Sequence, residues 1–170
     1  CHGSMVTDGE DAAAGDNNRD GARRRTAAPI YNMLRWFAST QIRNVACLGG
    51  NLATASPISD MNPLLCSLGA TLVLASRPKP DGGIARRHVS VSDFFLRYRT
   101  VDKTDMEIIE RVDVPLVQSF EYVAPFKQAR RREDDISIVT SGMRIKLSPE
   151  TDNGDGDDRC DVWDQKNCAP

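Results

Sequence analysis

Histidine is almost missing from this chain of 170 residues, which contains only His2 and His88. With these two alone, neither a Ser/His/Asp relay nor an HExxH zinc motif can be drawn. The five cysteines, at positions 1, 47, 66, 160 and 168, form no CxxC pair and have no histidine partner nearby. The sequence therefore predicts no metal site and disfavours a self-contained hydrolase or metalloenzyme.

Long apolar runs are absent as well. No stretch approaches the roughly 18 apolar residues of a membrane span, and the first thirty residues lack the apolar segment of a secretory signal. We therefore expect a soluble cytoplasmic protein, with a peroxisomal location as the alternative, and no membrane partner. The formal net charge of −2 disfavours a nucleic-acid partner.

Composition divides the chain into three parts. Residues 1–29 carry five acids and four arginines among Ala, Gly and Asn, and are predicted to be a disordered arm. Residues 149–170 carry seven acids against Arg159 and Lys166, and are predicted to be an acidic disordered tail. Residues 30–148 hold sixteen basic and twelve acidic side chains, a net charge of +4 that suits an anionic ligand. This middle segment is the predicted folded domain.

Apolar spacing within 30–148 indicates an α+β fold. Ile30, Met33, Leu34 and Phe37 recur at helical spacing and predict a helix over 30–40, and Pro63 and Gly69 bound a second helix over 61–68. A third short helix would be capped by Ser92 or Asp93. Strand candidates are 44–48, 70–76, 85–91, 107–115, 119–129 and 136–147. We expect a mixed, largely antiparallel sheet of roughly five strands with short helices on it.

Three segments differ from an ordinary core. In VACLGGNLATASPISDMNP (45–63), the paired glycines either form a turn or let backbone N–H groups approach a phosphate. FKQARRREDDI (126–136) is either a solvated, self-paired loop or a charged hinge beside an anionic ligand that Lys127 would meet. In LRWF (34–37), Arg35 and Trp36 are either surface residues or part of a cation–π cluster.

Taken in order, LRWFA (34–38), the run 45–63 and FKQARRREDDISIVTSGMR (126–144) resemble the flavin-binding domain of the xanthine dehydrogenase family of molybdenum hydroxylases. The resemblance covers about residues 30–148. It implies part of a vanillyl-alcohol-oxidase (PCMH)-type FAD-binding domain, with FAD as cofactor and NAD+ as electron acceptor. Enzymes of this family are homodimers that pass electrons from iron–sulfur clusters through FAD to NAD+ while oxidising hypoxanthine and xanthine to urate.

By the same resemblance, nine residues line FAD: Phe37, Cys47, Leu48, Gly49, Gly50, Asn51, Asp60, Ile109 and Lys127. The segment 47–51 would hold the diphosphate, although Cys47 replaces the family's usual serine. Asp60 is suited to accept a hydroxyl hydrogen bond and Lys127 to compensate negative charge. Arg35, Trp36 and Arg132 match a cluster that gates dehydrogenase against oxidase behaviour. The acids of REDDI would lie on the nicotinamide side.

Several parts of the family pattern are not found in this sequence. They are a second FAD-binding segment of the LVxGNTE type before LRWFA, the cysteine-rich iron–sulfur domains and the molybdopterin domain. We therefore expect an incomplete flavin site. Two alternatives stay open: a catalytically inactive flavin-domain remnant acting as an interaction module, and a fragment of an aldehyde oxidase, which the REDDI pattern disfavours.

Overall fold

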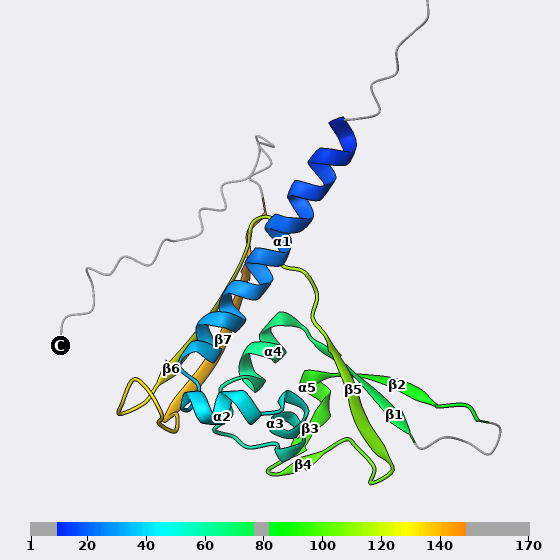
Figure 1. Ribbon diagram of the computed structural model, residues 1–170, viewed down its shortest axis with the longest axis vertical. Helices are drawn as coiled ribbons and strands as arrows, with labels where there is room; N and C mark the ends of the chain where they lie inside the picture. Colours follow the sequence, from blue (N-terminus) through cyan, green and yellow to red (C-terminus); the bar gives the residue numbers. More distant parts are fainter. Residues whose placement is uncertain (1–9, 77–81, 149–170) are drawn as a thin grey trace, which may run out of the picture.

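A long helix and a two-stranded hairpin lie beside a small core of short helices and a three-stranded sheet (Figure 1). The computed structural model describes residues 10–76 and 82–148, with side chains from residue 18 onward. No helix within these ranges combines the length and the apolar character needed to cross a membrane. The predicted tail 149–170 lies outside the described residues.

The helices are α1 (Glu10–Arg35), α2 (Thr40–Val45), α3 (Leu48–Thr54), α4 (Asn62–Leu68) and α5 (Val91–Phe94). The strands are β1 (Thr71–Ser76), β2 (Arg86–Ser90), β3 (Phe95–Arg97), β4 (Thr100–Val101), β5 (Glu107–Asp113), β6 (Glu121–Gln128) and β7 (Val139–Lys146). The described strands form sheets in the orders β2-β1-β5, β3-β4 and β6-β7, and every pairing is antiparallel. The predicted α+β class is confirmed.

The core is centred on α4 and β1, both of which the sequence predicts. Pro63 lies in the first turn of α4, where a missing N–H costs no helical hydrogen bond, and Gly69 ends the helix with φ 69°. Its leucines pack against β1 and α5 in one buried cluster that includes Leu64, Leu65, Leu68, Leu72, Leu74 and Phe94. Each such side chain contributes up to about 1.5–3 kcal/mol by burial. This packing fixes the loop that enters α4, at residues 56–61.

The predicted disordered arm is wrong for residues 10–29, which form most of α1. Thr26 accepts a hydrogen bond from the Val117 N–H at 2.8 Å, and Ala22 and Thr26 are buried. This part of the helix is thus held by small and polar residues instead of large apolar ones, which is why the apolar pattern did not reveal it. Pro29, normally a helix-starting residue, lies inside the helix.

The predicted strand over 44–48 is also wrong, because this segment joins α2 to α3. Gly49 and Gly50 lie inside α3, so they form neither a turn nor a loop. Five residues contain too little periodicity to separate a buried strand from the end of a helix. The two short helices instead carry segment 47–51 toward β5, where a Cβ added to Gly49 would be 3.8 Å from the Ile109 Cβ.

Strands β1, β2, β5, β6 and β7 agree with predicted ones, whereas the short strands β3 and β4 were not predicted. The register of β5 against β1 shifts between Val73 and Leu74, so that Glu110 is an extra residue. This bulge lets Ile109 and Val112 both pack against the core although they are three residues apart. The helix cap is Ser90, whose hydroxyl accepts from the Ser92 N–H, and is neither Ser92 nor Asp93.

The β6–β7 hairpin lies close against α4 through Gly142. A Cβ at this position would be 2.6 Å from the Pro63 carbonyl oxygen and 2.8 Å from the Leu64 Cα, so only glycine permits this approach. Next along β7, Arg144 donates to the Leu68 carbonyl at 3.3 Å and to the buried Glu121 carboxylate at 2.9 Å. These contacts place β6, and with it Lys127, beside the loop that enters α4.

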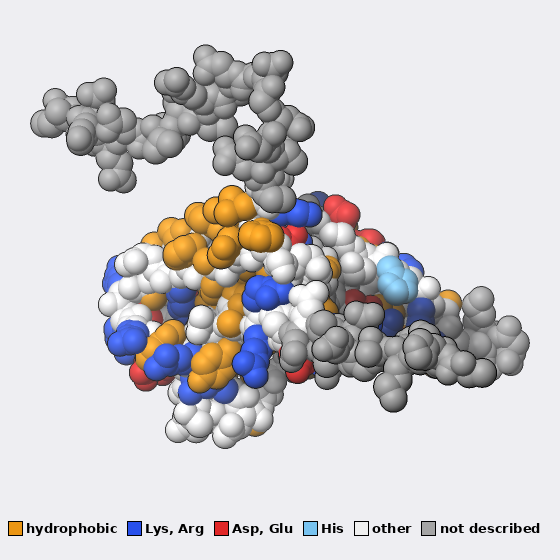
Figure 2. Space-filling view, turned by 90° about the horizontal axis from the view of Figure 1, so that it is seen from above, with side chains coloured by type: hydrophobic (Ala, Val, Ile, Leu, Met, Phe, Trp, Pro, Cys, Tyr) orange, Lys and Arg blue, Asp and Glu red, His pale blue; other side chains and the backbone are white. Residues whose placement is uncertain are grey.

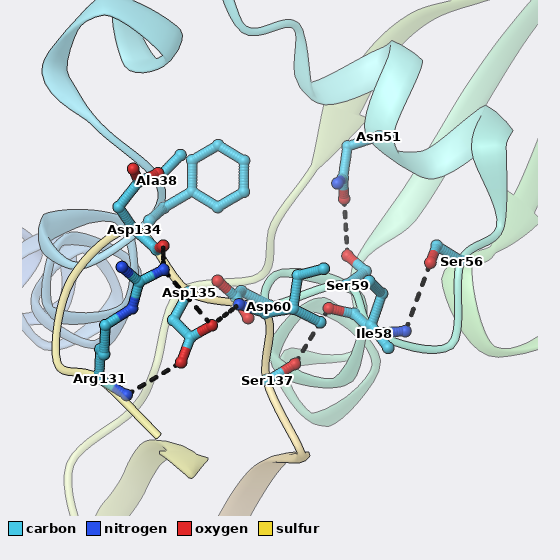
Figure 3. A pocket seen from close by; sticks show the side chains of 12 residues that line it. Ala38, Asn51, Ser56, Ile58, Ser59, Asp60, Arg131, Asp134, Asp135 and Ser137 are labelled. Carbon is cyan, nitrogen blue, oxygen red and sulfur yellow. Dashed lines mark hydrogen bonds and ion pairs between the residues drawn. The ribbon is translucent and has the colours of Figure 1, made fainter. Parts of the chain in front are cut away.

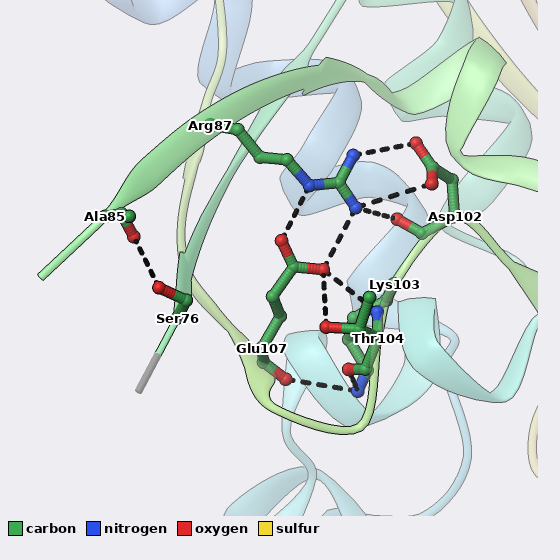
Figure 4. Close-up of polar contacts among 7 residues, drawn as sticks. All are labelled: Ser76, Ala85, Arg87, Asp102, Lys103, Thr104 and Glu107. Atoms are coloured by element: carbon green, nitrogen blue, oxygen red, sulfur yellow. Dashed lines mark hydrogen bonds and ion pairs between the residues drawn. The ribbon is translucent and has the colours of Figure 1, made fainter. Parts of the chain in front are cut away.

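A polar network ties the turn between β4 and β5 to strand β2 (Figure 4). Arg87 donates to Glu107 at 2.7 Å and to Asp102 at 2.8 Å, and Glu107 also accepts from the Thr104 N–H at 2.9 Å. These donors lower the pKa of Glu107 from 4.5 to about 2, with the Arg87 hydrogen bond the largest cause. The network holds the start of β5, the strand that carries Ile109.

Glu107→Gln is expected to lower the free energy of unfolding by about 1–3 kcal/mol near neutral pH, because one charge-assisted hydrogen-bond partner is lost. The pKa of Glu107 is depressed on folding, so its contribution is complete above pH 4.5 and disappears as the pH falls toward 2. Urea unfolding at a series of pH values should therefore show the two proteins converging in acid. Glu110→Gln, in the exposed pair with Arg86, is the matched control. A difference that persists unchanged into acid would contradict this assignment.

Candidate functional site

Segments far apart in the sequence meet at one cavity of about 420 Å³ (Figure 3). Phe37 and Ala38 approach from the end of α1, Asn51 from α3, and Asp60 from the loop before α4. The loop between β6 and β7 closes the other side with residues Arg131, Asp134, Asp135, Ile136 and Ser137. The three motifs that the sequence singled out therefore lie around a single space.

A second, more apolar cavity of about 330 Å³ adjoins the first, and Phe37 and Asn51 line both. Its walls come from α1, α3, α4 and the end of β5, and include Leu34, Cys47, Leu48, Met61, Leu65, Val112 and Val114. Arg43 of α2 is the charged residue of this lining. Its guanidinium donates to the carbonyls of Phe37 and Ala38 at 2.8 and 2.9 Å, which fixes the chain where α1 ends.

Asn51 is oriented at the junction of the two cavities by Ser59. The buried Ser59 hydroxyl donates to the Asn51 Oδ1 at 2.7 Å and accepts from the Asn62 N–H at 3.3 Å. The Asn51 Oδ1 therefore already accepts a hydrogen bond within the protein. Its Nδ2 has no hydrogen bond to another described residue, so an amide donor remains for a ligand.

An ion pair closes the floor of the site. The Lys127 Nζ lies 2.7 Å from the Asp60 Oδ2, and the two side chains are only 12% and 5% exposed. Sequence analysis assigned each of these residues separately to a ligand, whereas the structure pairs them with each other. Removing one partner of such a buried pair would leave an uncompensated charge, so the contact couples β6 to the loop before α4.

The acids of the β6–β7 loop have different environments. Asp135 accepts from the N–H groups of Arg131 and Ile136 at 2.9 and 3.0 Å, and the first of these is the main cause of its lowered pKa. Asp134 is exposed, has φ 49°, and its carboxylate forms no ion pair with any residue of the described ranges. Asp135 thus stabilises the loop, while the carboxylate of Asp134 is left at the cavity rim.

Trp36 is flanked by two arginines. The guanidinium carbon of Arg35 lies 4.7 Å from the indole centroid and that of Arg132 lies 4.1 Å from it. Because Arg132 comes from the β6–β7 loop, the predicted cation–π cluster with another segment is confirmed. This contact joins the end of α1 to the same loop that covers the larger cavity.

The sequence model described as "FAD binding domain in molybdopterin dehydrogenase" matches residues 12–117. This match covers more than half of the chain. The chain belongs to this family of FAD-binding domains. The family is one of oxidoreductases, as the sequence predicts.

Among curated relatives of this family member, the xanthine dehydrogenase of Dictyostelium discoideum is 48% identical over 124 residues, or 73% of this chain and 9% of the relative. Xanthine dehydrogenase 1 of Arabidopsis thaliana is 51% identical over 118 residues, or 69% of this chain and 8% of the relative. The chain thus spans less than a tenth of the length of these relatives.

Solved structures agree with the fold of the family. Reconstituted CO dehydrogenase from Oligotropha carboxidovorans superposes with a TM-score of 0.63 at 23% identity, over 74% of this chain and 41% of the other. Quinoline 2-oxidoreductase from Pseudomonas putida 86 gives a TM-score of 0.58 at 25% identity, over 75% of this chain and 44% of the other. The matched chains are therefore more than twice as long as the part that this family member shares with them.

All nine residues predicted to line FAD lie in or beside the two cavities. Phe37, Cys47, Leu48, Asn51 and Asp60 line them, Lys127 binds Asp60, Ile109 faces Gly49, and Gly50 follows in the same turn of α3. Sequence analysis did not single out Arg43, Ser59 and Ser137. Ser59 precedes Asp60 inside the segment 45–63, but nothing in the sequence reveals that its hydroxyl contacts Asn51.

Lys127→Met is expected to lower the free energy of unfolding by about 3–5 kcal/mol, because Asp60 would remain buried without its cation. Adding Asp60→Asn should restore most of this loss, since no buried charge is then left. Urea unfolding followed by circular dichroism measures both effects. Lys146→Met is the control, because Lys146 is 72% exposed and lies 3.9 Å from its partner Glu121. A Lys127→Met protein as stable as the parent chain would show that the ion pair is not coupled to folding.

Proposed function

We propose that this chain supplies one wall of the FAD site in a xanthine dehydrogenase-type molybdenum hydroxylase. The observation that carries the proposal is the convergence of Phe37, Asn51 and Asp134, one from each of three separated motifs, on one cavity. Membership of the FAD-binding family and the xanthine dehydrogenase names of the relatives support it. The second FAD-binding segment expected from the resemblance would come from another part of the whole protein.

The two cavities fit different parts of FAD. Asp60, Asp134 and Asp135 line the larger one, so an anionic diphosphate would be repelled there. Carboxylates accept hydrogen bonds from hydroxyl groups, so this cavity suits the ribityl chain or a ribose. The smaller cavity has apolar walls, with Arg43 and segment 47–51 at its edge. This lining suits one of the ring systems of FAD, with the diphosphate beside it.

In this proposal the residues bind and orient the cofactor. Asn51 donates from its Nδ2, while Ser59 keeps the amide in the required orientation. Phe37 separates the two cavities with an apolar ring, and Lys127 binds one oxygen of Asp60, which leaves the second oxygen to accept a hydroxyl. The small residues Gly49 and Gly50 leave the α3 backbone open to the diphosphate. When bound, FAD supplies the redox chemistry that connects iron–sulfur clusters to a soluble electron acceptor.

The electron acceptor, the substrates and the oligomeric assembly are properties of the whole protein. We propose NAD+ as the electron acceptor and hypoxanthine and xanthine as substrates that are oxidised to urate. The iron–sulfur and molybdopterin domains of the whole protein would supply the electrons, and the assembly would be a cytoplasmic homodimer. The xanthine dehydrogenase names of the relatives and the REDDI motif support this reading over an aldehyde oxidase.

FAD fluorescence tests the binding proposal directly. Titrating the chain into dilute FAD is expected to give a saturable change, and Asn51→Ala should weaken the affinity about fivefold, the equivalent of one hydrogen bond. Asn32→Ala is the matched control, because Asn32 is an exposed asparagine of α1 that lines neither cavity. If FAD fluorescence stays unchanged at every protein concentration, the inactive-remnant alternative is favoured instead.

The role of NAD+ as electron acceptor can be tested in an intact xanthine dehydrogenase that carries the β6–β7 loop of this chain. Asp134→Asn is expected to slow NAD+ reduction more than oxygen reduction, because the exposed carboxylate lies at the cavity and forms no ion pair with the residues that the structure describes. Asp135→Asn should impair both reductions alike, since Asp135 stabilises the loop itself. Steady-state assays with each acceptor give the ratio. An Asp134→Asn enzyme that loses both activities equally would contradict the assigned role.

A further inference from the structure

Arg43 is an exposed arginine whose side chain is nevertheless fixed by three contacts. Lysine and arginine side chains are scattered over the molecular surface, as Figure 2 shows for one face. Exposed ion pairs of such side chains usually contribute little to the fold, because solvent screens them and the long side chains lose entropy. Arg43 instead binds the backbone: its Nη1 donates to the carbonyls of Phe37 and Ala38 at 2.8 and 2.9 Å. Its Nη2 donates to the Thr40 Oγ1 at 3.0 Å.

The turn that Arg43 holds has an unfavourable backbone conformation. Helix α1 ends at Arg35, and Ala38 follows with φ 45°, in the left-handed region that favours glycine. A residue with a Cβ keeps such a conformation only where the surrounding structure determines it. The carbonyls before and after the Ala38 Cα both accept from Arg43, so the guanidinium spans the left-handed residue. A basic side chain on the carbonyls beyond a helix end is a recurrent way to fix that end.

The same turn carries the side chains of Trp36 and Phe37. Phe37 lines both cavities of the candidate site. The indole centroid of Trp36 lies 4.1 Å from the guanidinium carbon of Arg132, which belongs to the β6–β7 loop. A rotation of the backbone at Ala38 would therefore disturb both a wall of the candidate FAD site and the contact that holds this loop.

Arg43 also lines the smaller cavity, so a direct contact with the anionic diphosphate of FAD is the alternative role. The observed contacts favour an indirect role, because both terminal nitrogens of the guanidinium already donate within the protein. Turning the guanidinium toward a ligand would leave the carbonyls of Phe37 and Ala38 without this donor.

We propose that Arg43 is a positioning residue of the FAD site that acts through the backbone of Phe37 and Ala38. By fixing this turn from α2, it sets the place of the Phe37 ring between the two cavities and keeps Trp36 against the β6–β7 loop. The part of this inference that concerns FAD rests on the proposed function, whereas the part that concerns the turn does not. Two experiments test the two parts separately.

Acrylamide quenching of Trp36 fluorescence tests the turn without any ligand. The chain contains only Trp36 and Trp163, so Trp163→Phe leaves one reporter. In this background, Arg43→Met is expected to raise the quenching constant of the half-buried Trp36 about twofold, because the turn would open locally more often. Arg111→Met is the control, since Arg111 is 55% exposed, pairs with Asp113 of the same strand and lines neither cavity. An unchanged quenching constant in Arg43→Met would overturn the proposal.

Titration of flavin fluorescence with FAD and with riboflavin tests the effect on the cofactor. Riboflavin has the isoalloxazine ring and ribityl chain of FAD but lacks its diphosphate. Arg43→Met is expected to weaken the affinity for both ligands about tenfold, because Phe37 lies beside the part that they share. Arg43→Lys should retain most of the affinity, since an ammonium group has donors for both carbonyls.

Each other outcome of the titration counts against the proposal. A loss of affinity for FAD alone would show that Arg43 meets the diphosphate directly, and unchanged affinities would show that the turn does not influence the site. If the parent chain binds neither ligand, the proposed function fails and the FAD part of the inference fails with it, while the quenching result still decides whether Arg43 fixes the turn. Where circular dichroism shows that Arg43→Met does not fold, Arg43→Gln replaces it in both experiments, because it removes the guanidinium but keeps a polar side chain.

Discussion

The ion pair between Asp60 and Lys127 is the contact on which the arrangement of the site depends. Asp60 ends the loop before α4, and Lys127 lies on β6, so the pair joins the helical core to the hairpin across 67 residues of sequence. The contact is possible because Gly142 lets β7 lie against the backbone of α4. The loop that follows Lys127 is thereby placed over the larger cavity, where it contributes Arg131 and the two aspartates.

The same constraint explains why charged residues of both signs gather here. Arg132 stacks on Trp36, and Lys127 binds Asp60. The Asp135 carboxylate accepts a hydrogen bond from the Arg131 N–H of its own loop. Each of these charges stabilises the position of a segment, and the polar groups that the described residues still offer to a ligand include the Asn51 Nδ2, the Asp134 carboxylate and the second oxygen of Asp60. The site therefore combines a fixed frame with few free groups, a combination common in cofactor pockets.

Local signals in the sequence predicted the elements that depend on local interactions. Pro63 and Gly69 mark α4, and the β1–β2 and β6–β7 hairpins follow from short strand patterns separated by turns. Helix α1 was missed over residues 10–29 because it is anchored by a contact between Thr26 and Val117, 91 residues apart, which no periodicity records. Likewise, the bulge at Glu110 depends on pairing with β1 and is not visible in β5 alone.

For the site, the sequence indicated which residues are involved but not how they contact one another. Asp60 and Lys127 were each expected to meet a ligand, and their contact with each other was not foreseen. Ser59 went unnoticed although it orients Asn51. Such contacts are properties of the packed chain, because they join segments whose separation is set by α4 and Gly142. The family resemblance compensated for this gap by naming residues that the fold then brought together.

The central claim is that three separated segments form one FAD site. Hydrogen exchange of the chain with and without FAD measures this most directly, because it reports on each segment in a single experiment. The account predicts that FAD slows exchange together in residues 47–51, in the loop 56–60 and in the loop 129–138. Protection confined to one of these segments, or absent from all of them at saturating FAD, would contradict it.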